Sequence, residues 1–178
     1  EARIATNPFG AGIPRQGGPD IVVDMAASTL AMGRLSDARE RNIEIEQGWL
    51  TKSGHITPAG GVKGFALAVV AEALAGSLSS AGTVGYETPE ERQGVLAIGI
   101  DIEKLRPLAD FKADVNKFAT YLSETPVEAG ASPVQMPGEG SIKRIAERKT
   151  SGIPLHPVIW QRLQALASEL NIKAPTSL

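Results

Sequence analysis

Cysteine is absent from this chain of 178 residues, and histidine occurs only twice, as His55 and His156. Without cysteine the chain forms no disulfide and carries out no thiol chemistry. Because the two histidines lie far apart in the sequence, a zinc site is an unfavourable interpretation, and we expect no metal.

An excess of positive charge is also lacking, since 18 basic and 20 acidic residues give a formal net charge of -2. This balance argues against nucleic acid or an anionic membrane as a partner. No apolar run is long enough to span a bilayer, and no basic-then-apolar leader opens the sequence. We therefore expect a cytoplasmic protein. Its first residue is Glu1, which is compatible with a processed or partial chain.

The composition that remains, 42% hydrophobic and 21% charged, is that of an ordinary soluble globular protein. Three short runs indicate β-strands. Residues 20–26 form a β-branched run bounded by turn residues, which predicts a buried strand. Residues 94–102 are apolar on both faces, which predicts a central strand of a sheet. Residues 132–136 predict a third, short strand.

Five segments have the apolar spacing of helices, and they fall between or after these strands. They are residues 28–41, 64–78, 107–124, a basic helix within 137–152 that ends near Gly152, and a last helix from Pro157 to about Leu170. The second is apolar on every side except Glu72, which is typical of a helix buried at the centre of a domain. Residues 7–19 and 79–94 are expected to be loops. The fold class is therefore α/β, with a mixed β-sheet and flanking helices in one region over residues 1–178.

Standard site motifs fail on this sequence. Lys63 has a glycine after it instead of the Ser or Thr that a Walker phosphate loop needs. Gly138 and Gly140 begin a Rossmann fingerprint, but Lys143 stands where its third glycine belongs. The GxSxG hydrolase elbow and the metalloprotease and EF-hand spacings are absent as well.

Four polar loops remain, each with a structural alternative. They are "TNP" at 6–8, Asp24 to Ala26, "GGVKG" at 60–64 and "PGEGSIKR" at 137–144. Taken singly, "TNP" can simply build a turn, and Asp24 can cap the following helix. Lys63 can lie in solvent, and "PGEGSIKR" can open a solvated basic helix.

Taken together, the series "ATNPFGAGIP", "DIVVDMAASTLAMGRL", "GW", "PAGGVKGFALAVVAEALAGSLSSA" and "MPGEGS" with "SGIPL" occurs in one order. This series resembles the type 2 malate/L-lactate dehydrogenase family, the sulfolactate-dehydrogenase-like NAD(P)-dependent oxidoreductases, from Ala5 to about Asn171. The resemblance implies a non-Rossmann dinucleotide-binding fold, a homodimer, and hydride transfer between NAD or NADP and a small 2-keto acid or 2-hydroxy acid.

The resemblance also implies roles for individual residues. Those expected to bind the cofactor are Asp24, Met25, Ala26, Lys63, Gly64, Pro137, Gly138 and Glu139. Those expected to lie at the substrate are Thr6, Met32 and Gly33. A lysine beside glycines can meet a phosphate or ribose oxygen without obstruction by neighbouring side chains.

The departures from the family pattern concern catalysis. Family chains are longer, and their N-terminal half supplies a proton-donating histidine and an arginine for the substrate carboxylate. Neither His55 nor His156 matches the catalytic position, so the catalytic residue is unknown and is expected outside this sequence. Arg34 resembles the basic residue of the malate and lactate branch. The alternatives are a truncated, non-catalytic dinucleotide-binding or subunit-interaction module, and a plain structural domain.

Overall fold

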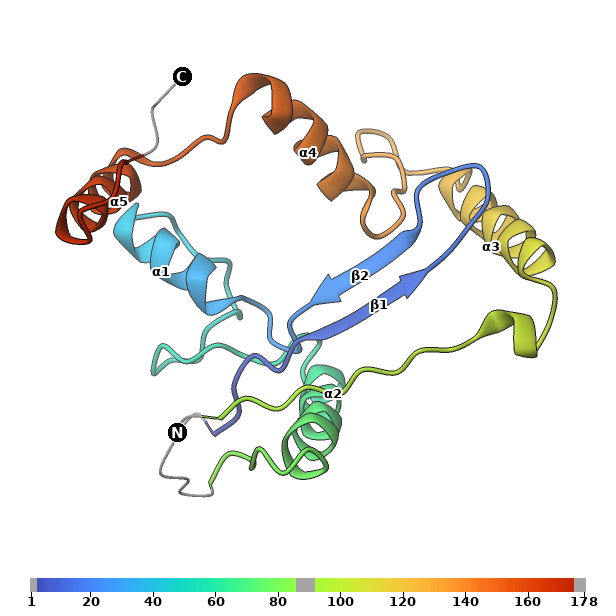
Figure 1. The fold of residues 1–178 in the computed structure, drawn as a ribbon, viewed down its shortest axis with the longest axis horizontal. Coiled ribbons are helices and arrows are strands. Elements are labelled where there is room, and N and C mark those ends of the chain that lie inside the picture. Colours follow the sequence, from blue (N-terminus) through green and yellow to red (C-terminus); the bar gives the residue numbers. More distant parts are fainter. Residues whose placement is uncertain (1–2, 86–91, 175–178) are drawn as a thin grey trace.

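The computed structural model describes residues 3–85 and 92–174, and it consists of a two-stranded hairpin with helices spread around it (Figure 1). The elements in chain order are β1 (Phe9–Ile13), β2 (Ile21–Met25), α1 (Met32–Glu40), α2 (Val62–Ala71), the π-helix η1 (Glu72–Ser77), the 3-10 turn η2 (Ile102–Lys104), α3 (Leu108–Ser123), α4 (Glu139–Ser151) and α5 (Pro157–Glu169).

The sheet is smaller than the sequence predicted. β1 pairs with β2 in antiparallel register, from Phe9 opposite Met25 to Ile13 opposite Ile21. The expected mixed sheet is therefore wrong for the described residues. The strand predicted at 20–26 is confirmed, but only Ile21 within it is buried, because a two-stranded hairpin covers little surface.

Two further strands were predicted wrongly. Residues 132–136 are irregular, and only Met136 among them is buried. Residues 94–101 are not paired as a strand, and three of their side chains, Val95, Ile98 and Ile100, are 71% to 79% exposed. Residues 94–101 are rich in apolar side chains, but the partners that a strand needs are not among the described residues.

The helices follow their local signals more closely. α3 matches the prediction within a residue at each end, α4 ends at Gly152, and Pro157 opens α5. α1 begins later than expected, at Met32, because the preceding residues pair with the turn that leads to α2: Thr29 donates its N–H to the Thr57 carbonyl at 2.9 Å.

The expectation that residues 64–78 are buried all round is wrong. Only Gly64, Ala68 and Gly76 are buried, whereas Phe65 is 50% exposed and Leu78 is 67% exposed. Asn7, which precedes β1, and Ala27, which follows β2, contact one side of this helix, and most of its apolar side chains are uncovered by described residues. The exposed apolar side chains of residues 64–78 therefore need a further layer of protein to cover them.

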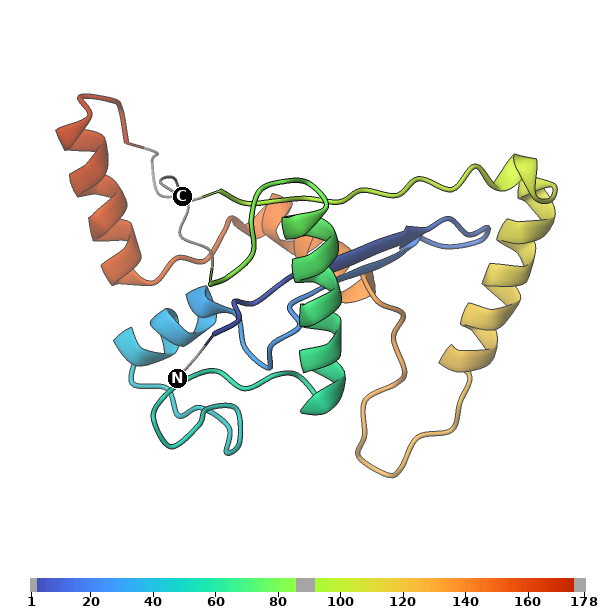
Figure 2. The same ribbon diagram turned by 90° about the horizontal axis from the view of Figure 1, so that it is seen from below.

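The core is correspondingly small. Its main cluster joins Ile21, Ala119 and Met136, so β2, α3 and the segment before α4 meet there. The accessible surface is 13994 Å², whereas a compact monomer of 18.7 kDa exposes roughly 8300 Å². Figure 2 shows the reason, since α3 and α5 stand at opposite ends of an open arrangement. Within the described residues, no helix combines the length and apolar character needed to cross a membrane.

Candidate functional site

Strand β2 is the meeting point of the three predicted cofactor segments. The first of them, Asp24 to Ala26, is its own C-terminal end. Asp24 and Met25 are exposed, and Asp24 pairs with Gly10 across the hairpin. Because α1 has Ala31 at its N-cap and no side-chain cap bond, the alternative that Asp24 caps that helix is wrong.

The segment Pro137 to Glu139 lies beside the other end of β2. Val22 donates its N–H to the Pro137 carbonyl at 3.0 Å. Gly138 packs so closely that a Cβ on it would lie 3.1 Å from the Val22 Cβ, and its φ of 97° also favours glycine. These two constraints fix the turn that starts α4.

The third segment, Lys63 and Gly64, reaches the residues just after β2. Ala59 donates its N–H to the Ala27 carbonyl at 2.9 Å, and Gly64 donates to the Ala59 carbonyl at 2.8 Å. Gly64 is buried, and Lys63 beside it is exposed. From Val22 to Ala27 the chain advances five residues, roughly 17 Å. The contacts of the three segments are therefore spread over a strip of about this length, made of β2 and the two residues after it.

The turn before Lys63 has a backbone that only glycine adopts readily. Gly60 and Gly61 have φ of 60° and 63°, and Gly61 is the N-cap of α2. The first N–H groups of a helix have no partner within the helix and carry the positive end of its dipole. Lys63 adds a full positive charge at this point, and it forms no ion pair with any residue that the structure describes. The region suits an anionic or polar ligand group.

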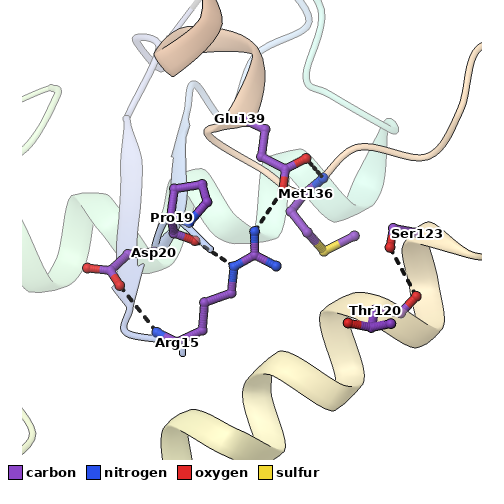
Figure 3. A network of polar contacts seen from close by, with 7 residues as sticks. All are labelled: Arg15, Pro19, Asp20, Thr120, Ser123, Met136 and Glu139. Atoms are coloured by element: carbon purple, nitrogen blue, oxygen red, sulfur yellow. Dashed lines mark hydrogen bonds and ion pairs between the residues drawn. The ribbon is translucent and has the colours of Figure 1, made fainter. Parts of the chain in front are cut away.

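Glu139 has a structural task in addition to its predicted cofactor contact (Figure 3). Its carboxylate accepts a bond from the Arg15 guanidinium at 2.8 Å and another from the Met136 N–H at 3.1 Å. The Arg15 side chain is only 9% exposed and also donates to the Pro19 carbonyl at 2.6 Å. Arg15 thus fastens the loop between the strands to the turn that starts α4. Sequence analysis missed it, because no local motif marks this contact.

A cavity of about 420 Å³ lies next to this strip, within the usual range for small-molecule sites. It brings together the segment before β1, the residues after β2, the turn before α2, and faces of α1 and α2. Its lining residues include Thr6, Ala27, Ser28, Met32, Leu35, Arg39, His55, Thr57, Phe65 and Ala68. Two of the three predicted substrate residues, Thr6 and Met32, line it, whereas Gly33 does not.

His55 also lines this cavity, although no sequence motif selects it. Its Nδ1 lies 2.9 Å from the Ser53 Oγ, which is 3.0 Å from the Thr51 Oγ1. These contacts hold the imidazole in a tight turn. A turn histidine without a motif carries no sequence signal, so only the fold reveals its position.

Asn7 of the "TNP" motif bonds to α2 and to Glu72, the first residue of η1. Its φ of 39° places it in the left-handed region. Its amide donates to the Ala68 carbonyl at 2.9 Å and to the Glu72 carboxylate at 2.7 Å. Glu72 in turn accepts the Val84 N–H at 2.6 Å. Residues 6–8 are not assigned as a turn, so the turn alternative for this motif is not confirmed; Asn7 instead bonds to α2 and η1, and Thr6 beside it lines the cavity.

The described residues form an α/β protein with a cavity of about 420 Å³ near the glycine-flanked start of α2. A family model described as malate/L-lactate dehydrogenase matches residues 1–164. The chain therefore belongs to the malate/L-lactate dehydrogenase family.

Individual relatives agree with this assignment. The chain is 34% identical to an L-lactate dehydrogenase of Cupriavidus necator over 198 residues, covering 99% of this chain and 56% of the relative. It is 31% identical to a malate/(S)-sulfolactate dehydrogenase of Methanothermus fervidus, covering 96% of this chain and 54% of that protein. The chain thus spans about half the length of the curated relatives it matches.

Solved structures show the same fold. A malate dehydrogenase from Entamoeba histolytica superposes with a TM-score of 0.83 at 21% identity, over 95% of this chain and 56% of that chain. One from Pyrococcus horikoshii gives a TM-score of 0.79 at 22% identity, with 98% and 54% covered.

Proposed function

We propose that this chain is the cofactor-binding part of an oxidoreductase that interconverts small 2-keto acids and 2-hydroxy acids of the malate and lactate type, with NAD or NADP. The observation that supports this most is the convergence on β2 of three segments that lie far apart in the sequence: residues 24–26, 63–64 and 137–139. Family membership supplies the reaction class. It also disfavours the alternative of a non-catalytic module.

The residues present fit a dinucleotide, which is elongated and anionic. The strip along β2 offers contacts roughly 17 Å apart. Glycine backbone at residues 60–61 and the Lys63 ammonium suit a phosphate or ribose oxygen. The fold that carries these contacts is proposed to be of the non-Rossmann type, since the glycines proposed to approach the cofactor precede α2 and the Rossmann fingerprint is missing.

When bound, the cofactor supplies or accepts the hydride of the reaction. The residues of this chain bind and orient the reactants. Thr6 offers a hydroxyl to an oxygen of the acid, and Met32 and Phe65 provide an apolar wall that limits access of water. Pro137 to Glu139 holds the cofactor from the other end of β2.

The catalytic groups are proposed to come from the part of the family fold that has no counterpart in these 178 residues. A general acid must protonate the developing alkoxide, and a cation must hold the carboxylate. His55 and His156 are not assigned to these tasks. The complete enzyme is proposed to act in the cytoplasm. It is also proposed to be a homodimer, because the exposed apolar side chains of α2 and α5 suit an interface.

A turnover assay tests this proposal. A family-length protein that carries this chain is expected to oxidise NADH or NADPH in the presence of oxaloacetate, pyruvate or a sulfonated 2-keto acid. The 178-residue chain alone is expected to show no turnover. Turnover by the isolated chain that disappears in His55→Ala or His156→Ala would overturn the assignment of catalysis to the remainder of the fold.

A further inference from the structure

Arg39 of α1 gives the cavity of about 420 Å³ a cationic end. Among the described residues of its lining, Arg39 is the only lysine or arginine, and none carries a carboxylate. The cavity follows one face of α1, from Met32 by way of Leu35 to Arg39, which is roughly 10 Å of helix. It therefore combines an apolar stretch with a positive charge.

The guanidinium of Arg39 has no hydrogen bond or ion pair with any residue that the structure describes. The two acidic residues of α1 are both bound by other arginines. Asp37 accepts from Arg41 at 3.1 Å, and Glu40 accepts from Arg162 at 2.7 Å. A guanidinium has five N–H donors, so an unpaired one at a cavity without carboxylates favours an anionic ligand.

His55 places a second polar group beside this cation. The Arg39 Nη2 lies 3.8 Å from the position that a Cβ on Gly54 would take, and Gly54 directly precedes His55. The turn is held firmly, since Thr51 Oγ1 accepts the His55 N–H at 3.1 Å and Ser53 Oγ lies 2.9 Å from Nδ1. The Nε2 atom bonds to no described residue, so it is available to a ligand.

Family membership leaves open which acids the cavity accepts. One relative is an L-lactate dehydrogenase, and another is a malate/(S)-sulfolactate dehydrogenase. Lactate and pyruvate carry one anionic group, whereas malate, oxaloacetate and their sulfonated counterparts carry two. The choice between these acids therefore depends on whether a second cation lies within reach of the bound substrate.

We propose that Arg39, assisted by His55, binds a second anionic group of the substrate. The substrate class is then 2-keto and 2-hydroxy acids that carry a carboxylate or sulfonate on C3. This inference rests on the proposed function, which places the acid in this cavity with Thr6 at one of its oxygens. The planar guanidinium fits such a group through two parallel hydrogen bonds. Arg39 thus sets specificity and takes no part in hydride or proton transfer.

The alternative is that Arg39 serves only the helix. It lies in the last turn of α1, where a cation offsets the negative end of the helix dipole. A role of that kind would not depend on which substrate is bound. Arg41, the C-cap of α1, brings the same charge to the same helix end without lining the cavity, so it provides the matched control.

Steady-state kinetics of a family-length protein that carries this chain test the proposal, with oxaloacetate, 3-sulfopyruvate and pyruvate as substrates. Arg39→Met is expected to raise KM for the first two acids by about 10- to 150-fold, the loss of a charged hydrogen bond. KM for pyruvate and all kcat values are expected to stay unchanged, as are all values in Arg41→Met. The larger rise, for oxaloacetate or for 3-sulfopyruvate, identifies carboxylate or sulfonate as the preferred group. Equal changes for all three acids, or none, would overturn the proposal.

Binding of malate decides the matter even where the protein turns over none of these acids, a result that would count against the proposed function instead. Malate and lactate are titrated into the same protein with NADH present, so that no hydride transfer occurs. Malate is expected to shift the backbone amides of Arg39 and His55, and lactate is not. The affinity for malate is expected to fall by about 10-fold or more in Arg39→Met. Malate that shifts neither amide, or binds this variant with undiminished affinity, would show the proposal to be wrong.

Discussion

Gly64, at the start of α2, lies directly against the backbone of Ala27, the second residue after β2. A Cβ on Gly64 would lie 2.5 Å from the Ala27 carbonyl oxygen, a distance that real Cβ contacts do not reach. The contact sets the position of Lys63 relative to the end of β2. It therefore links the two predicted cofactor segments of the N-terminal half of the chain.

Gly64→Ala is expected to displace α2 from β2, destabilise the protein and weaken cofactor binding. Gly33→Ala is the matched control, because a Cβ on Gly33 meets no atom within 4 Å. In helix α1 that alanine is expected to add up to about 1 kcal/mol of stability. Thermal unfolding and cofactor titration of both variants provide the comparison. A Gly64→Ala protein with normal stability and affinity would contradict the account of this contact.

Lys63→Ala is expected to weaken NADH or NADPH binding by about 1.5 to 3 kcal/mol, because it removes a charged hydrogen bond. This corresponds to about 10- to 150-fold in Kd. Calorimetry on a family-length protein measures it, with Lys104→Ala on the η2 turn as the control for loss of one positive charge. Unchanged affinity in Lys63→Ala would remove Lys63 from the site.

Arg15→Met is expected to lower the free energy of unfolding by about 2 to 3 kcal/mol, since it leaves Glu139 and the Pro19 carbonyl without their charged donor. Arg162→Met provides the control. Arg162 pairs with Glu40 at 2.7 Å, but its side chain is 62% exposed, so its loss is expected to cost less than about 1 kcal/mol. Chemical denaturation compares the two variants. An equal loss of unfolding free energy in both variants would show that the Arg15 contact stabilises the protein no more than the exposed Arg162 pair does.

Asp114 provides a prediction on pH. Its hydrogen bond with the Arg106 guanidinium, at 2.8 Å, lowers the pKa of the carboxyl below its ordinary value of 3.8, and Lys117 adds a smaller effect. Because the folded pKa is the lower one, the stabilisation is complete above pH 3.8 and disappears as the pH falls through the folded value. Titration of Asp114 by NMR is expected to give a midpoint below 3.8. Arg106→Ala should return it toward 3.8, by more than Lys117→Ala does.

The parts of the fold that sequence predicted well are those that local patterns determine. The apolar stripe of α3, the proline that opens α5 and the glycine that ends α4 act within a few residues. Burial was predicted poorly, because it depends on which other segments cover an element. The apolar segments at 64–78 and 94–101 show this directly, since their composition indicates an interior and the described chain offers no cover.

The candidate site likewise has some residues that local motifs mark and others that no local pattern predicts. The glycines around Lys63 and the "PGE" turn are visible as local motifs. The Arg15–Glu139 contact, the Asn7–Glu72 contact and the position of His55 join residues that are distant in the sequence or carry no pattern. These features are visible only in the folded chain.

The most direct test of the proposed function is to titrate a family-length protein carrying this chain with NADH and NADPH while observing its backbone amides by NMR. One of the two cofactors is expected to bind and to shift the amides of residues 24–26, 63–64 and 138–139, the three segments that meet at β2. Absence of binding by both cofactors, or shifts that leave all three segments unchanged, would contradict the account.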